Sequence, residues 1–259
     1  MGKFYESIGD DHAKWILEQK LFFVATAPLD PQGTVNASPK GYDSLRIMGP
    51  NQVCYLDLTG SGIETQSHLQ QNGRITFLFM SFGEGPRILR LFGRGRVAQV
   101  DTPEYKELYA KYFARPAVSE TLPESEDSSV SPPAPYELEG ASQIRSIIVA
   151  DIHKVGTSCG WAVPYYQYLG ERPTLRSFWG KMSRSQLGQY WAIENTQSVD
   201  GLPGMRHELM GPEWAPAPET LRAIVYKKAT SIPIQDLVRQ GALVVAGFGA
   251  GLAVSRLFR

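Results

Sequence analysis

The chain has 259 residues, of which 42% are hydrophobic and 20% charged, as in an ordinary globular protein with a buried core. Lys plus Arg and Asp plus Glu number 26 each, so no overall positive field favours nucleic acid, and a nucleic-acid-binding function is disfavoured. Cys54 and Cys159 lack the Cys or His spacing of a metal site, and this usage fits a reducing compartment. The N-terminal segment lacks the apolar run of a secretory signal, so we expect a cytoplasmic protein.

Turn signals divide the first part of the chain into short apolar segments. A helix is predicted over 10–20, and six strands follow it. The strands are predicted over 22–27, 35–41, 53–58, 74–82, 88–100 and 143–155. Only one clear helix lies among them, whereas parallel strands would need a crossover helix at most connections. The pattern therefore predicts an antiparallel sheet that closes on itself.

The helix among the strands is predicted over 63–72. Ser61 and Glu64 have the spacing of a capping box. Gly73 follows the predicted C-terminus of the helix, where a residue with a left-handed backbone is common. A further helix is predicted over 103–113, with Asp101 or Thr102 as its cap.

Composition divides the chain into three parts. Residues 1–168 form the strand-rich domain. Within it, the stretch 117–135 is rich in Ser, Pro and acidic residues and is too poor in apolar side chains to offset its ordering entropy, so it predicts a mobile surface loop. Residues 169–240 are predicted to be a helical extension, with helices over 183–195 and 218–228.

The third part is an apolar tail over 241–259. Its uninterrupted apolar stretch, 241–254, is shorter than the ~20 residues that span a bilayer. Packing against the protein and contact with a membrane surface both stay open, and we favour packing.

Two segments near the middle of the sheet could bind a ligand. Alternation places Asn36, Ser38 and Lys40 on one face of the second strand, which is either a solvated face or a ligand face. Gly60 and Gly62 precede the helix over 63–72. They let a ligand approach the backbone, and the free amides of a helix start favour an anion, although an ordinary helix cap has the same pattern.

The fifth strand is rich in arginine. Arg90, Arg94 and Arg96 share one face, and they either protect an edge against aggregation or provide a partner for a phosphate. The four histidines show no metal spacing, and no nucleophile motif is present, so no catalytic side chain and no metal ligand is assigned.

Taken together, these segments carry a resemblance. In chain order, VNASPKG, TGSGIETxxHL, NGRITFLF and LRLFGRGRV resemble the pyridoxamine 5'-phosphate oxidase-like family of FMN-binding split-barrel proteins. The likeness covers about residues 10–115 and the strand at 143–155. SCGWAVPYYQYLGER and SVDGLPG are similar to a fungal-type branch of the same group.

The resemblance implies a mainly β (α+β) fold: a six-stranded antiparallel split β-barrel with flanking helices and a helical C-terminal extension. It also implies a homodimer with FMN in a groove between the subunits. Ser38, Lys40 and Gly41 would line the phosphate or ribityl side of FMN, and Leu56 and Asp57 the edge of its ring. The residues implied to cap the phosphate are Gly62, Ile63, Glu64 and Thr65, with Arg90 as a further candidate on the fifth strand.

One residue pair departs from the family pattern. The oxidase itself carries basic residues at the start of this helix, where this chain has Glu64 and Thr65. An acid there repels a phosphate dianion unless it bonds Ser61 in the capping box. The sequence thus favours an FMN-dependent oxidoreductase of unspecified substrate. The alternative is a non-catalytic protein that binds flavin or haem, or a dimeric scaffold without a cofactor.

Overall fold

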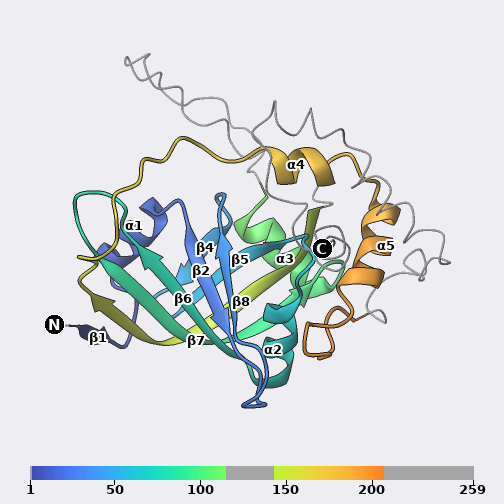
Figure 1. Cartoon of the computed structure of the whole chain (residues 1–259), viewed down its shortest axis with the longest axis horizontal. Coiled ribbons are helices and arrows are strands. Elements are labelled where there is room, and N and C mark those ends of the chain that lie inside the picture. The colour runs from blue at the N-terminus through green and yellow to red at the C-terminus, as the bar shows by residue number, and fades with distance from the viewer. Residues whose placement is uncertain (1, 115–142, 207–259) are drawn as a thin grey trace, which may run out of the picture. The chain divides into compact units, whose positions relative to one another are not determined.

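The computed structural model describes residues 2–114 and 143–206, all of which fall within one compact unit, Met1–Ala215 (Figure 1). The predicted loop at 117–135, the predicted helix at 218–228 and the apolar tail at 241–259 lie outside the described residues. Among the helices that are described, none is both long and apolar enough to cross a membrane.

The fold is an antiparallel sheet with helices around it, as predicted. The strands are β1 (Lys3–Tyr5), β2 (Phe22–Thr26), β3 (Asn36–Lys40), β4 (Leu45–Gly49), β5 (Gln52–Leu58), β6 (Arg74–Met80), β7 (Ile88–Gln99) and β8 (Ile144–Ser158). They are ordered β3-β2-β6-β7-β8-β5-β4, and β1 pairs with the far end of β8. All six predicted strands are present, and β1 and β4 bring the number in the described residues to eight.

The expectation that the sheet closes on itself is wrong. Within residues 2–114 and 143–206, no ladder joins β3 to β4, although only the turn 41–44 separates them in the chain. Tyr42 in this turn has a left-handed backbone, with φ of 60°, and its hydroxyl donates a hydrogen bond to the carbonyl of Arg172 at 2.7 Å. The turn is therefore held against the C-terminal part of the chain, and β3 and β4 remain two separate edges.

The helices are α1 (Asp10–Glu18), α2 (Glu64–Asn72), α3 (Pro103–Tyr112), α4 (Thr174–Trp179) and α5 (Arg184–Glu194). All were predicted within the described residues except the six-residue α4. The Thr102 hydroxyl caps α3, and Gly73 ends α2 with φ of 71°, so both predicted helix ends are confirmed. Figure 1 shows α3, α4 and α5 gathered at the same end of the sheet.

The predicted capping box of α2 is wrong. Ile63, not Ser61, is the residue before the helix, and no side chain caps it. The cause is the side chain of Ile63, which is 1% exposed and packs among buried apolar residues, so the helix begins after it. Glu64 instead accepts a hydrogen bond from the amide of Val199 at 3.3 Å.

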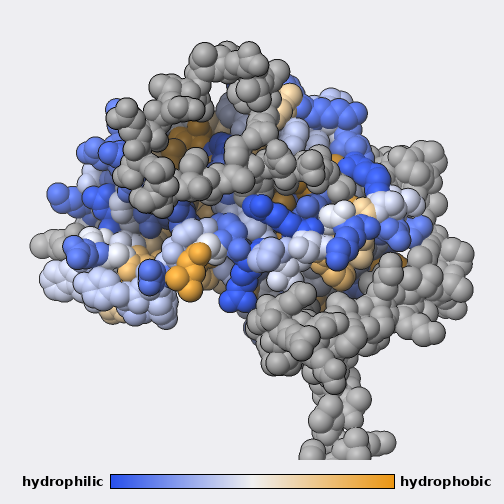
Figure 2. All heavy atoms as spheres, turned by 90° about the horizontal axis from the view of Figure 1, so that it is seen from above, coloured by the Kyte–Doolittle hydropathy of each residue, from blue (hydrophilic) through white to orange (hydrophobic). Residues whose placement is uncertain are grey.

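Two apolar clusters lie on opposite faces of the sheet. One contains Val24, Tyr55, Phe77 and Leu91, inside the curved sheet. The other packs the opposite face of β5 and β8 against α3 and α5, and Trp191 is its largest fully buried side chain. Burial on both faces explains the apolar runs at 53–56 in β5 and 147–150 in β8. The described surface seen in Figure 2 is by contrast mostly hydrophilic, with scattered apolar side chains.

Candidate functional site

A pocket of about 390 Å³ lies between the end of β3, the end of β5 and the start of α2. It is lined by Ser38, Pro39, Lys40, Gly41, Tyr42, Ser44, Leu56, Leu58, Thr59, Gly60, Gly62, Glu64, Thr65, Arg145 and Leu175. The volume lies within the range of small-molecule and cofactor pockets. The pocket opens where β3 and β4 separate, so the unclosed sheet provides the room for it.

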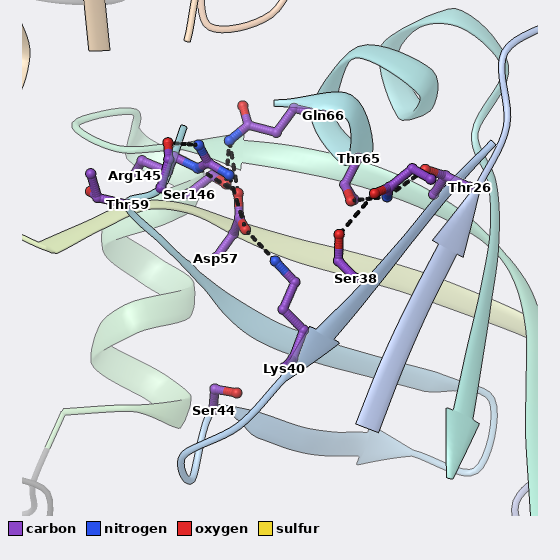
Figure 3. A network of polar contacts seen from close by, with 12 residues as sticks. Thr26, Ser38, Lys40, Ser44, Asp57, Thr59, Thr65, Gln66, Arg145 and Ser146 are labelled. Carbon is purple, nitrogen blue, oxygen red and sulfur yellow. Dashed lines mark hydrogen bonds and ion pairs between the residues drawn. The ribbon is translucent and has the colours of Figure 1, made fainter. Parts of the chain in front are cut away.

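Lys40 extends from β3 toward the buried carboxylate of Asp57 on β5 (Figure 3). Its Nζ lies 3.2 Å from Asp57 Oδ1, and the Lys40 side chain is 21% exposed whereas that of Asp57 is 0% exposed. The ammonium also lies 5.7 Å from the centre of the Tyr55 ring. Lys40 is thus positioned by two residues of β5 at the wall of the pocket.

Asp57 is the centre of a buried polar network. Arg145 Nε donates to its Oδ2 at 2.9 Å, Gln66 Nε2 donates to the same oxygen at 3.0 Å, and Ser146 Oγ donates at 3.4 Å. Burial by itself raises the pKa of Asp57. The charges of Arg145 and Lys40 and the bonds from Arg145 and Gln66 outweigh it, so the pKa of this carboxyl lies well below its usual range.

Acid should therefore weaken the fold through Asp57. Because its pKa is lower in the folded than in the unfolded chain, the stabilisation is present above the ordinary carboxyl pKa near 3.8 and is lost as the pH falls through the folded value. We expect the free energy of unfolding to fall steeply below about pH 4. Urea unfolding between pH 3 and 7 measures this, and a flat profile over that interval would contradict it.

A second polar chain runs from the pocket wall into the protein. Ser38 Oγ donates to Asn36 Oδ1 at 2.8 Å, and Asn36 Nδ2 lies 3.0 Å from Thr65 Oγ1 and 3.2 Å from Thr26 Oγ1. The Thr26 hydroxyl is 2.9 Å from Nδ1 of the buried His68. These bonds fix β3 against the first turn of α2. The predicted shared face of Asn36, Ser38 and Lys40 is therefore a pocket-side face.

The start of α2 forms the third side of the pocket. The first backbone bond of this helix runs from the Ser67 amide to the Ile63 carbonyl at 3.1 Å. No described residue accepts a hydrogen bond from the amides of Glu64, Thr65 or Gln66. Such free amides at a helix start attract an anion. The Glu64 carboxylate also lines the pocket, and a Cβ added at Gly62 would lie 2.5 Å from its Oε2.

The charges around the pocket cancel. Lys40 and Arg145 are positive, and Asp57 and Glu64 are negative. The lysine that the sequence suggested for a phosphate is already paired, and the helix start already carries a carboxylate. Binding of an anion in this pocket therefore depends on hydrogen-bond donors more than on the net charge of the lining residues.

The structure brings most of the predicted site residues together. Seven of them line the pocket: Ser38, Lys40, Gly41, Leu56, Gly62, Glu64 and Thr65. Asp57 lies beneath the wall and contacts Lys40. Ile63 points into the apolar cluster next to α5. Arg90 lies in the middle of β7, opposite Leu78 and Gly156, and is not among the lining residues.

Sequence reasoning missed several residues of the site. Arg145 of β8 lines the pocket, and its charge lies just before the apolar run at 147–150, which was an available signal. Gln66 and Ser146 gave no local signal. Leu175 of α4 also lines the pocket, and Asn195 at the end of α5 bonds Arg145. Both lie beyond residue 168, in the predicted extension.

The family model for pyridoxamine 5'-phosphate oxidase matches residues 8–136. A curated relative, pyridoxamine 5'-phosphate oxidase family protein ustO of Aspergillus flavus, is 37% identical over 217 residues, which cover 78% of this chain and 77% of the relative. The chain belongs to the pyridoxamine 5'-phosphate oxidase family. The recognition made from the sequence segments is thus confirmed.

Solved structures similar to this member of the pyridoxamine 5'-phosphate oxidase family are more distant in sequence. A HupZ variant of Group A Streptococcus is 17% identical with a TM-score of 0.38, covering 58% of this chain and 99% of that one. A pyridoxamine 5'-phosphate oxidase-related, FMN binding protein of Nostoc punctiforme is 14% identical with a TM-score of 0.33, covering 56% and 77%.

Proposed function

We propose that this protein binds FMN in the pocket between β3, β5 and α2 and acts as an FMN-dependent oxidoreductase. The observation that carries the proposal is the convergence of Lys40 and the free amides of α2 on one pocket. Membership of the pyridoxamine 5'-phosphate oxidase family supports it. As part of the proposal, the protein is a homodimer with the flavin between its subunits.

The donor set around the pocket fits a phosphate. The amides of Glu64 and Thr65, the hydroxyl of Thr65 and the ammonium of Lys40 all belong to lining residues. Donors of these kinds from a helix start and a neighbouring strand are what a phosphate needs. They would hold it even though Asp57 neutralises part of the charge of Lys40.

The apolar part of the pocket fits a ring. Leu56, Leu58 and Leu175 line it, and they come from β5 and α4. When bound, the flavin would supply the hydride or electron transfer. The residues of this chain bind and orient it, and Asp57 acts through Lys40 and Arg145, not as a proton donor, because its low pKa keeps it ionised.

A second candidate is a non-catalytic binder or a scaffold without a cofactor. The observation that favours it is the cancellation of charge around the pocket, since a phosphate dianion gains little from a site of zero net charge. The two candidates differ in whether the protein retains a phosphorylated flavin.

Titration of the purified protein with FMN and with riboflavin tests the proposal. We expect FMN to bind more tightly than riboflavin, and flavin to be released on denaturation. A colourless protein that binds neither supports the scaffold.

Lys40→Met tests the assigned phosphate partner. We expect it to weaken FMN binding about fivefold, less than the roughly tenfold loss of an unshared charged hydrogen bond, because Asp57 already pairs with the lysine. Riboflavin binding should stay unchanged. Lys14→Met, at an exposed position on α1, is the matched control. Equal FMN affinity of the two variants would remove Lys40 from the site.

A further inference from the structure

The segment 195–204, here called the C-terminal clasp, lies along α2. Gln70 Nε2 donates to the Gly204 carbonyl at 2.8 Å, and Ser67 Oγ donates to the Leu202 carbonyl at 3.4 Å. The Val199 amide bonds the Glu64 carboxylate. The clasp lies beyond residue 136, where the family match ends. A segment outside the matched region therefore contacts Glu64 and Arg145, which line the pocket.

Asn195 of the clasp bonds the turn before α2. It is 0% exposed, and its Nδ2 donates to the carbonyls of Gly60 at 2.9 Å and Ser61 at 3.2 Å. Its Oδ1 accepts from Arg145 Nη1 at 3.0 Å. Only one orientation of the amide allows this, because a guanidinium can only donate and a carbonyl can only accept. The Asn195 amide thus links Arg145 to the turn before α2 by accepting from the one and donating to the other.

These bonds determine which way the following amides point. No cis peptide bond is present among the described residues, so each carbonyl and the next amide point in opposite directions. The Gly60 carbonyl is shared, because Arg145 Nη1 also donates to it at 3.0 Å, whereas the Ser61 carbonyl is bonded by Asn195. With the Ser61 carbonyl directed at Asn195, the amide of Gly62 is directed away from Asn195. Gly62 itself lines the pocket.

We propose that Asn195 is a positioning residue for the phosphate of the bound flavin: it holds the Ser61 carbonyl toward α5 and so presents the amide of Gly62 to the pocket. This inference rests on the proposed function. It makes phosphate recognition depend on the C-terminal clasp as well as on Lys40 and α2.

Two variants of Asn195 separate its two contacts. Asn195→Asp keeps an acceptor for Arg145 but has no donor for the carbonyls, whereas Asn195→Ala loses both. For each variant, FMN and riboflavin are titrated and the ratio of the two affinities is compared with that of the natural chain. We expect both variants to lower the preference for FMN about tenfold, as for the loss of bonds to a charged group.

Ile152→Ala is the matched control, because Ile152 is buried in the cluster on the other face of the sheet. It should lower stability and leave the ratio unchanged. The proposal is overturned if Asn195→Asp keeps the natural ratio, since the Arg145 contact would then suffice. It is also overturned if Ile152→Ala shifts the ratio as much, since loss of stability alone would then explain the effect.

Hydrogen exchange of the flavin-free protein gives a readout that does not need a ligand. The Ser67 amide closes the first turn of α2 through its bond to the Ile63 carbonyl. Both Asn195 variants should exchange faster at this amide than the natural chain and Ile152→Ala. If the natural chain binds no flavin, the proposed function fails while this measurement still tests the ordering of the turn. Unchanged exchange overturns the role of Asn195, whatever the flavin titration shows.

Discussion

Replacement of Asp57 by Asn should lower the free energy of unfolding by about 3 kcal/mol at pH 7, because a buried cation then loses its counter-charge. Arg145 is 5% exposed at its side chain and points its Nε at Asp57, so water cannot take the place of the carboxylate. Asn can still accept one hydrogen bond, which places the expected loss at the lower end of the range for a broken buried pair.

The measurement is urea unfolding of the variant and of a surface control. Glu104→Gln removes an ion pair with Arg96 in which both side chains are about half exposed, 44% and 48%, and should cost less than about 1 kcal/mol. The slope of the urea dependence should stay the same in both variants. A loss for Asp57→Asn as small as that of Glu104→Gln would show that the buried network adds little to stability.

Glu64→Gln should strengthen FMN binding about tenfold and leave riboflavin binding unchanged. Glu64 is the first residue of α2 and lines the pocket, so its charge opposes a phosphate at the helix start. Repulsion between unit charges a few ångströms apart near a protein surface is worth roughly 1–4 kcal/mol. Gln keeps an oxygen for the Val199 amide, so the turn that contacts it should stay in place.

Titration of the Glu64→Gln variant with FMN at low and high salt separates an effect of the Glu64 charge from an effect of the side chain's shape. The gain in FMN affinity should shrink at high ionic strength, because the repulsion is partly screened. Glu18→Gln, on the exposed side of α1, is the control for the loss of one negative charge from the molecule. If riboflavin gains as much as FMN from Glu64→Gln, the carboxylate obstructs the ring or the ribityl chain instead. A natural chain that retains no FMN but gains it on this replacement would connect the two proposed functions.

The strands and helices with a clear periodic pattern could be predicted from the sequence, and the short elements could not. Alternation was enough to place Asn36, Ser38 and Lys40 together on one side of β3. β1 consists of three exposed residues and α4 of six residues, which is too little for a periodic signal. The turn 41–44 between β3 and β4 is bonded to Arg172, which is far away in sequence.

The candidate site shows the same limit. The residues around Gly62 carry a local pattern, so their place at a helix start was predictable. One partner of Asp57 is Arg145, 88 positions further along the chain, and nothing near Asp57 indicates it. The Ser61–Glu64 spacing gave a wrong prediction of the helix cap, because the spacing of two residues contains no information about the packing of Ile63. Pairings across the sheet and contacts with the extension needed the three-dimensional structure.

The open edge of the sheet at β3 has a consequence for self-association. A free edge strand offers unpaired amides and carbonyls to any extended peptide, and proteins interrupt such edges to stay apart from one another. β3 has Pro39 as its fourth of five residues, opposite Phe23 of β2, and proline has no amide hydrogen to offer. The edge strand beside the pocket therefore lacks one backbone amide donor. This discourages the pairing of β3 with an edge strand of another molecule next to the pocket.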